Sequence, residues 1–353
     1  MERADKDLAF MLRYENVAWY SDGEVRILDR RIYPAKTEFV RCASYEDVIF
    51  ALRDMVTQST GPYTAAGAAM ALAAFQCRDK TKEKQLEFLT KASQDIANAR
   101  PTTVKRMALI TEECLCAAKK AIEEEKDVSA AINSRLTELN NIRYNKVYAM
   151  AKYLCCKIPK SGGVMTQCFG ETIVGQMCRV LKETGKEDVR VFCPETRPYF
   201  QGARLTATVC RDMGLDVTVI TDNMPACVMK KENVSVFTSA ADAICMDGSV
   251  INKIGTYQIA IAARYHGIPY YVTGAPDRMH VSARDVQIEQ RDPEFSLQAM
   301  GVRTAASGVK GYYPAFDVTP PELVCGVVTD RGIFDPVSLE TYFLPDDKPE
   351  LVI

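Results

Sequence analysis

Short β-rich runs alternate with helix-length segments in the second half of the chain, and this alternation restricts the fold more than any other feature. The runs are GGVMTQC, VRVFCPE, DVTVITD, VSVFTSAADAI and IPYYVTG. Strands that alternate with helices in this way form a parallel sheet covered on both faces. Residues 159–353 are therefore predicted to form a Rossmann-like parallel-sheet domain, and the fold class is α/β.

The first half follows a different pattern. Residues 17–40 alternate apolar and polar side chains around the turn SDG, which predicts a hairpin followed by a third strand. Beyond it, SYEDVIFALRDMV begins with Ser44 as a helix N-cap and Asp47 three residues later, and apolar residues then recur at helical spacing. Similar patterns continue to residue 155. Residues 1–158 are predicted to form a mostly helical domain with a small β-meander.

Charge and hydropathy limit the partners that this chain can have. The formal net charge is −2 and the isoelectric point is near 5.9, so no basic field attracts nucleic acid or an anionic membrane surface. No apolar run approaches the ~20 residues that span a bilayer. We therefore expect a small-molecule partner, with no nucleic acid and no membrane.

The cysteines predict a reducing compartment. Their number is thirteen, which is odd, and the opening residues MERADKDLAFMLRYEN lack the features of a secretory leader, so a cytoplasmic location is expected. Cysteine pairs occur as C-x-C and C-C rather than C-x-x-C, and only two histidines are present, so no metal site is predicted. Most of the thiols are expected to be small core hydrophobes.

Polar and reactive residues follow the predicted strands. These residues are Cys168, Glu195, Asp222 and Asp242. Ligands of such sheets bind at the carboxyl ends of the strands, where all four would lie. Lys253 stands near the start of the next helix, and a helix N-terminus beside a lysine suits an anion. The alternative is that each carboxylate caps a helix and that Cys168 is an inert, buried thiol.

Four longer segments carry a resemblance to a known family. They are CPETRPYFQGARLTA, GLDVTVITDNM, GSVINKIGTYQIAIAARYHGIPYYV and GVKGYYPAFDVTPPELV. These segments closely resemble those of methylthioribose-1-phosphate isomerases, a group related to ribose-1,5-bisphosphate isomerases and to the regulatory subunits of the eukaryotic translation-initiation exchange factor. The similarity extends from about Val17 to Phe334, and it implies a sugar-phosphate isomerase that acts as a homodimer without a cofactor.

The resemblance also implies roles for individual residues. The family's isomerases use a cysteine and an aspartate at the positions that match Cys168 and Asp242. By this resemblance, Asp242 would protonate the ring oxygen of the sugar, and Cys168 would serve the hydrogen transfer between C2 and C1. The family's ligand contacts match Arg100, Gln201, Asn252 and Lys253. An aspartate that acts as an acid near neutral pH needs a raised pKa, which a dry, apolar pocket would provide.

Three departures from the family pattern bear on the substrate. The family loop R-G-A-P-A-I-G becomes QSTGPYTAAG, in which Gln58 replaces an arginine and one anion contact is lost. T-H-C-N becomes TQCF around the cysteine, and G-A-D-R-I becomes AADAI, which places Ala243 after the aspartate. Ser59 and Thr60 could still help to cradle an anion at the start of the following helix. Equally, the Ala/Gly-rich run could simply permit close helix packing.

Three functions remain open at this point. The first is an aldose–ketose isomerase of methionine salvage that acts on S-methyl-5-thioribose 1-phosphate or 5-deoxyribose 1-phosphate. The second is a ribose-1,5-bisphosphate isomerase, against which the uncharged Gln58 weighs because that substrate has two phosphates. The third is a non-catalytic module that senses sugar phosphates, against which the retained Cys168 and Asp242 weigh because a scaffold needs neither.

Overall fold

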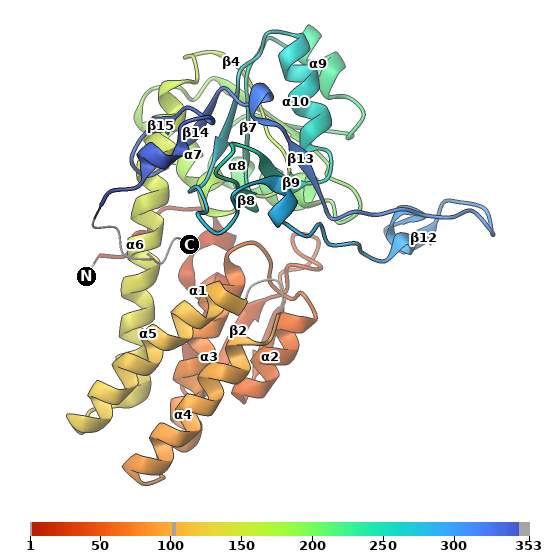
Figure 1. The fold of residues 1–353 in the computed structure, drawn as a ribbon. Helices are drawn as coiled ribbons and strands as arrows, with labels where there is room; N and C mark the ends of the chain where they lie inside the picture. The colour runs from red at the N-terminus through yellow and green to blue at the C-terminus, as the bar shows by residue number, and fades with distance from the viewer. Residues whose placement is uncertain (1, 101–103, 346–353) are drawn as a thin grey trace. The chain divides into compact units, whose positions relative to one another are not determined.

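A computed structural model of the chain describes residues 2–100 and 104–345, and these residues form two compact units (Figure 1). The units divide between Asn145 and Lys146, inside the long helix α6 (Val128–Cys156). The sequence pattern places the division after residue 158, just past the end of the same helix. The α/β class predicted from the sequence is confirmed.

The first unit opens with the predicted meander. Strands β1 (Ala18–Ser21), β2 (Glu24–Leu28) and β3 (Phe39–Cys42) pair antiparallel in that order. Asp22 and Gly23 make the hairpin turn with φ of 51° and 80°, which is the left-handed backbone that a tight two-residue turn requires. The short helix α1 (Tyr14–Val17) precedes the hairpin.

Helices make up the rest of the first unit. They are α2 (Tyr45–Arg53), α3 (Gly61–Cys77), α4 (Lys82–Ala97), α5 (Val104–Glu123) and the first part of α6. The predicted cap of α2 is confirmed, because the Ser44 hydroxyl accepts the Asp47 N–H at 3.2 Å and the Asp47 carboxylate accepts the Ser44 N–H at 2.9 Å. These reciprocal bonds satisfy donors that a helix start leaves unpaired.

Helix α3 forms the centre of this unit. Its residues from Ala65 to Ala74 are all at most 2% exposed, so the helix is apolar and covered around its whole circumference. Small side chains allow the close approach of its neighbours: a Cβ at Gly67 would lie 2.4 Å from a methyl carbon of Leu136 on α6. The Ala/Gly-rich run is therefore a packing element along most of its length.

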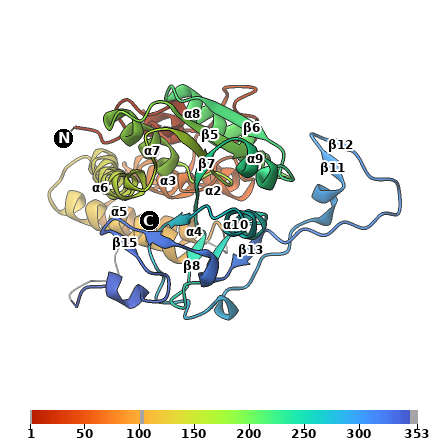
Figure 2. The same cartoon turned by 90° about the horizontal axis from the view of Figure 1, so that it is seen from above.

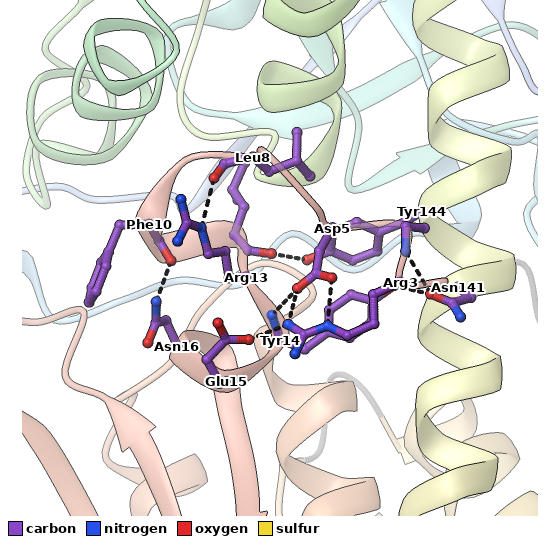
Figure 3. A network of polar contacts seen from close by, with 12 residues as sticks. Arg3, Asp5, Leu8, Phe10, Arg13, Tyr14, Glu15, Asn16, Asn141 and Tyr144 are labelled. Carbon is purple, nitrogen blue, oxygen red and sulfur yellow. Dashed lines mark hydrogen bonds and ion pairs between the residues drawn. The ribbon is translucent and has the colours of Figure 1, made fainter. Parts of the chain in front are cut away.

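A polar network fastens the N-terminal segment to α6 within the first unit (Figure 3). The buried Asp5 carboxylate accepts the Tyr14 N–H at 2.6 Å, and Arg3 pairs with both Asp5 and Glu15. The Asn141 side-chain oxygen accepts the Tyr14 hydroxyl at 2.8 Å and the Ala4 N–H at 2.9 Å. Because the buried carboxylate is paired, its burial is compatible with a stable fold.

The second unit contains the large sheet. Its strands, in spatial order, are β15 (Ile333–Phe334), β14 (Gly326–Val328), β10 (Tyr270–Thr273), β7 (Val234–Ala240), β4 (Gly162–Met165), β5 (Val189–Pro194) and β6 (Val217–Ile220). All pairs are parallel except β14 with β15. Every β-rich run quoted from the sequence forms a strand of this sheet. The Rossmann-like prediction is confirmed.

Helices cover the two faces of this sheet. Helix α7 (Thr172–Glu183) contacts α8 (Ala207–Asp212), and α9 (Pro225–Lys231) contacts α10 (Thr256–Tyr265). Figure 2 shows α8 and α10 on opposite sides of β5 and β7. A second, small sheet runs in the order β13 (Phe316–Thr319), β9 (Val250–Lys253) and β8 (Ala243–Ile244). Within the described residues, no helix combines the length and apolarity that a bilayer crossing demands.

One further strand pair and several short helical turns complete the described elements. The hairpin of β11 (Gln298–Ala299) and β12 (Val302–Arg303) lies in the long segment between β10 and β13. The 3₁₀ turns and the π-helical turn η3 are the following: η1 (Phe10–Leu12), η3 (Gly202–Thr206), η4 (Ala283–Asp285), η5 (Pro293–Ser296), η6 (Pro321–Leu323) and η7 (Leu339–Tyr342).

Candidate active site

The strand order places a crevice between the ends of β4 and β7. From β4 the chain proceeds outward through β5 and β6, and from β7 it proceeds in the other direction through β10 and β14. This reversal is the topological switch point of a doubly wound sheet, where ligands bind at the carboxyl ends of the strands. Cys168 follows β4 and Asp242 follows β7, and the two strands pair directly. The predicted catalytic pair thus flanks the switch point.

Left-handed backbone marks the same edge. Cys168 has φ of 58°, and Glu171, Thr196 and Phe200 have φ of 53°, 62° and 58°. For residues other than glycine, this conformation costs roughly 1 kcal/mol or more, and such residues are enriched at functional sites. Because all four follow β4 or β5, the strained segments surround one point of the sheet.

Hydrogen bonds hold Cys168 in this conformation. Its N–H donates to the Thr196 hydroxyl oxygen at 3.2 Å, and its carbonyl accepts the hydroxyl of Thr206. Asp222 in turn accepts the N–H groups of Thr196 and Arg197 at 2.8 and 2.6 Å. Asp222 therefore orients the loop that carries Thr196, rather than capping α9.

Burial keeps Cys168 a neutral thiol near pH 7. Burial raises its pKa to about 11, and the carboxylate of Asp242 acts in the same direction, while the ammonium of Lys253 opposes both. Lys253 is only 4% exposed, and burial lowers its pKa, an effect that the nearby Cys168 and Asp242 counteract. Cys168, Asp242 and Lys253 thus form one electrostatically coupled group.

Lys253 and Asn252 end strand β9, just before α10. The Lys253 Nζ donates to the Ala315 carbonyl at 3.0 Å and lies 4.6 Å from the centre of the Phe316 ring. The Asn252 side chain donates to the Thr256 hydroxyl at 3.0 Å. An ammonium has three donors and Ala315 engages one of them, so the buried cation can also bind an anion. The prediction that Lys253 lies near a helix start is confirmed.

Gln201 has a buried polar atom that no described residue satisfies. The residue is 7% exposed, immediately precedes the π-helical turn η3, and its Oε1 lacks a hydrogen-bond partner. A Cβ on the neighbouring Gly202 would lie 1.8 Å from the Pro194 carbonyl oxygen, so only glycine permits this approach to the end of β5. A buried acceptor without a partner costs about 1–3 kcal/mol, which a ligand that donates to it would recover.

Asp242 departs from the expected environment. Its side chain is exposed, so the dry, apolar pocket predicted around it is not present in this structure. The physical reason is its place in the fold: it joins β7 to β8, which is an edge strand of the small sheet, and neighbouring Ala241 and Ala243 are themselves only partly buried. Its backbone N–H nevertheless donates to the Ile251 carbonyl at 2.9 Å, which anchors the residue beside β9.

The other predicted ligand contacts belong to the first unit. Gln58, Ser59 and Thr60 precede α3, and the Gly61 N–H at the helix start already donates to the Gln58 carbonyl at 3.1 Å. Ser59 is exposed with φ of 57°. Arg100 is partly buried beyond the end of α4, and residues 101–103 of the same segment lie outside the described residues. The structure thus groups Cys168, Asp242, Gln201, Asn252 and Lys253 on one unit and these four residues on the other.

Sequence reasoning missed Arg291 as a member of the site. Its guanidinium pairs with Glu289 through two contacts of 3.1 and 3.2 Å, and its positive charge lowers the pKa values of both Cys168 and Lys253. Burial opposes the charge on Arg291, but Glu289 holds its pKa above the usual value. The segment QIEQRD forms no named helix or strand, and the sole hint was a glutamate two residues before an arginine.

A cavity of about 20 Å³ lies against Cys168 within the second unit. Its lining includes Cys168, Ile173, Met177, Thr206 and Ala240. This volume holds one water molecule and not a sugar. A sugar phosphate would therefore have to bind outside this cavity.

Comparison with known proteins identifies the family. The initiation factor 2 subunit family matches residues 58–336. Methylthioribose-1-phosphate isomerases from Chloroflexus aurantiacus and Heliobacterium modesticaldum are 34% and 36% identical to this chain, over 91% of it in both cases and over 95% and 96% of their own lengths.

Solved structures agree with the sequence comparison. The 5-methylthioribose 1-phosphate isomerase from Pyrococcus horikoshii OT3 superimposes with a TM-score of 0.82 at 30% identity, covering 96% of each chain. The translation initiation factor eIF-2B subunit delta from A. fulgidus gives 0.80 at 32% identity, covering 91% of this chain and 96% of its own. The resemblance seen in the sequence motifs is confirmed, and the chain belongs to the initiation factor 2 subunit family, together with proteins named methylthioribose-1-phosphate isomerase.

Proposed function

We propose that this protein is an aldose–ketose isomerase that converts S-methyl-5-thioribose 1-phosphate to the corresponding 1-phosphoketose. The observation that carries the proposal is the pair Cys168 and Asp242 at the switch point between β4 and β7. The isomerase names of relatives that match almost the whole chain support the same substrate. The reaction would belong to methionine salvage.

The chemistry of the substrate explains why two groups are needed. Phosphate on the anomeric oxygen prevents the spontaneous ring opening that a free hemiacetal undergoes. The enzyme must therefore protonate the ring oxygen while the bond from that oxygen to C1 breaks, and a hydrogen must move from C2 to C1. Electrons balance within the sugar, because C2 is oxidised to a ketone and C1 is reduced to a phosphorylated CH₂. Protons balance too, because the C2 hydroxyl loses one proton as the ring oxygen gains one. No external oxidant or reductant is consumed.

The residues divide these tasks by their chemistry. Asp242 is the acid for the ring oxygen, since a positioned carboxyl group can donate a proton in the transition state. Cys168, a thiol whose pKa is raised to about 11, lies beside the carbons as a neutral group rather than as a thiolate nucleophile. Its part is the hydrogen transfer between C2 and C1.

Cations and amides bind the rest of the substrate. Arg100 and Lys253 are each assigned as an anion contact, the first through its planar fork and the second as a point charge. Gln201 and Asn252 bind hydroxyl or phosphate oxygens, and the unsatisfied Oε1 of Gln201 suits a sugar hydroxyl donor. Gln58, Ser59 and Thr60 complete the anion contacts from the loop before α3.

Further parts of the proposal concern the setting of the enzyme. We infer a homodimer in the cytoplasm that requires no nucleic acid. All thirteen cysteines are unbonded thiols, and eight of them are buried, which suits a reducing compartment and agrees with their predicted role in the core.

A substrate panel tests the function. The purified protein is incubated with S-methyl-5-thioribose 1-phosphate, 5-deoxyribose 1-phosphate, ribose 1,5-bisphosphate and free methylthioribose, and NMR detects the C2 ketone of the product. We expect the fastest turnover with the methylthio sugar phosphate. Preference for the bisphosphate would replace the substrate assignment, and the absence of turnover with every compound would favour a sensing module.

A further inference from the structure

Tyr313 is a buried phenol whose hydroxyl has no hydrogen-bond partner among the described residues. The side chain is 4% exposed, and its oxygen is fully covered. Buried polar groups are nearly always paired, so an unpaired hydroxyl in a native structure calls for an explanation. A ligand that binds in the neighbouring site and pairs with the hydroxyl is one explanation. The contacts of Tyr313 show whether it lies at that site.

The backbone of Tyr313 ties it to the Lys253 and Arg291 side of the site. Its carbonyl accepts the Arg291 N–H at 3.0 Å. Two residues further, the Ala315 carbonyl accepts both the Lys253 ammonium at 3.0 Å and the Ile254 N–H at 3.2 Å. Tyr313 thus belongs to the short segment that positions the buried lysine of the site.

The ring of Tyr313 is held on the same side. Its centre lies 6.2 Å from that of Tyr199, edge to face, and the Arg291 guanidinium lies 5.6 Å from the centre of the Tyr199 ring. This packing fixes the direction of the phenol. Since the side chain is 4% exposed and its oxygen is covered, the hydroxyl has no solvent molecule as a partner.

The charges nearby bear on the protonation of this hydroxyl. Burial raises the pKa of Tyr313 to about 12, Arg291 lowers it, and a negative charge on Cys168 would raise it. Arg291 is close enough to influence the oxygen, but the pair does not reach hydrogen-bond geometry. At neutral pH the phenol therefore keeps its proton, and Arg291 can only donate, so the O–H hydrogen is available to an acceptor.

We infer that Tyr313 is a further substrate-binding residue, whose hydroxyl donates a hydrogen bond to a sugar oxygen on the Lys253 and Arg291 side of the site. This inference rests on the proposed isomerase function and extends it, because it adds a donor to the sugar-binding set of Gln201 and Asn252. Gln201 offers an unpaired acceptor and Tyr313 an unpaired donor, and a sugar presents hydroxyl groups that can pair with either kind.

The test compares Tyr313→Phe with Tyr312→Phe. The first change removes one buried hydroxyl and keeps the ring, whereas Tyr312 is 75% exposed and serves as the matched control. KM and kcat are measured with S-methyl-5-thioribose 1-phosphate, and the melting temperature is measured with and without each compound of the substrate panel. We expect Tyr313→Phe to lower kcat/KM roughly threefold to tenfold, mainly through KM, and the control to leave it unchanged.

The melting temperature separates binding from structure. Without ligand, Tyr313→Phe should melt at the wild-type temperature or slightly above it, because the hydroxyl has no partner to lose. The rise on ligand addition should be smaller than for the wild type. A kcat/KM within twofold of the wild type, or a clear drop in the ligand-free melting temperature, would overturn the role of Tyr313 alone. A wild-type protein that neither turns over nor is stabilised by any panel compound would overturn the proposed function, and this inference with it.

Discussion

Helix α3 and the candidate site at the carboxyl ends of the strands both contain buried residues, but burial stabilises the first region and costs free energy in the second. The residues of α3 from Ala65 to Ala74 are uniformly covered and apolar, so each contributes packing and hydrophobic stabilisation. The candidate site instead contains a left-handed Cys168 after β4, a buried Lys253 at the end of β9 and, after β5, a Gln201 acceptor without a partner. Each of these features costs stability in the protein without ligand. The comparison indicates that the first region maintains the fold, whereas the second sacrifices stability for a site that a ligand completes.

The largest effect should come from removing the pair at the switch point. We expect Cys168→Ala and Asp242→Asn each to lower kcat by at least about 10²-fold, because each removes a group that acts on the reacting atoms. The fall in kcat is measured by quenching the reaction and detecting the ketose by NMR. The melting temperatures of both variants should stay close to that of the wild type. Asp242 is exposed, and Cys168→Ala introduces no buried polar group.

Cys325→Ala is the matched control for the thiol. Cys325 is exposed and lies beside β14, away from the ends of β4 and β7, so its removal should leave kcat unchanged. Wild-type turnover in either Cys168→Ala or Asp242→Asn would refute the assignment of the catalytic pair and, with it, the contrast between the two regions.

The opposite outcome is expected in α3. Leu72 is fully buried at the centre of the first unit, so Leu72→Ala should lower the free energy of unfolding by about 2–5 kcal/mol through lost burial and a cavity. Below the melting transition, kcat should be close to the wild-type value. Denaturant unfolding and turnover are measured on the same preparation. A kcat that falls as steeply as in Cys168→Ala would mean that the two regions are not separable.

The sequence predicts some of these features well because their physical causes are local. The β-rich runs of the second unit and the Ser44 cap depend on neighbouring residues, and all of them form as expected. Strand-end positions of Cys168 and Asp242 follow from the same runs, since parallel strands bring their carboxyl ends to one edge. Their roles, in contrast, came only from the family resemblance.

Features that depend on contacts between segments far apart in the sequence were not predicted. β9 is a strand because it pairs with β13, more than sixty residues further along the chain, and neither segment shows a strong pattern alone. Arg291 joins the site through the backbone bond to Tyr313 rather than through a motif. The exposure of Asp242 depends on the edge position of β8, which no local pattern reports.

Binding of the anion should show an intermediate effect. Lys253→Met keeps an unbranched side chain in the buried position but removes the charge, so KM for the sugar phosphate should rise by the equivalent of about 1.5–3 kcal/mol. Arg100→Ala should raise KM to a similar extent. The exposed Lys310→Met is the control for charge loss. If free methylthioribose were a better substrate than its 1-phosphate, the anion-binding role of both residues would fail.

The pH dependence of the free energy of unfolding tests the cost of a buried group at the start of α10. Asp317 accepts the N–H groups of Gly255 and Tyr257 at the start of α10, at 2.7 and 3.2 Å, and burial raises its pKa from 3.8 to about 6. A raised pKa means that the folded protein binds the proton more tightly, so this group's stabilisation is complete below pH 3.8 and is lost as the pH rises through 6. Asp317→Asn should remove that loss.

The measurement for Asp317 is the free energy of unfolding at pH 4 and pH 7 for the wild type and Asp317→Asn. Relative to the variant, the wild type should lose about 1–3 kcal/mol between these pH values. Asp47→Asn, in the exposed capping box of α2, is measured alongside as the control for loss of a capping carboxylate. A wild-type curve that rises relative to Asp317→Asn would contradict the raised pKa.

The smallest effect is expected at the loop before α3, where the chain departs from its family. Gln58 replaces an arginine there, and a glutamine offers two donors and an acceptor but no charge. The Gln58 carbonyl already accepts the Arg30 guanidinium at 2.9 Å, so the backbone is held independently of the side chain, and a new arginine can extend from it. Gln58→Arg should keep activity on the sugar 1-phosphate and lower KM by no more than about threefold, since an exposed charge in water gains little. Steady-state kinetics with Gln58→Ala as the control measure this change. A folded Gln58→Arg variant that no longer binds the substrate would mean that the loop has been rebuilt around another ligand, and the methylthioribose assignment would then give way to a different sugar.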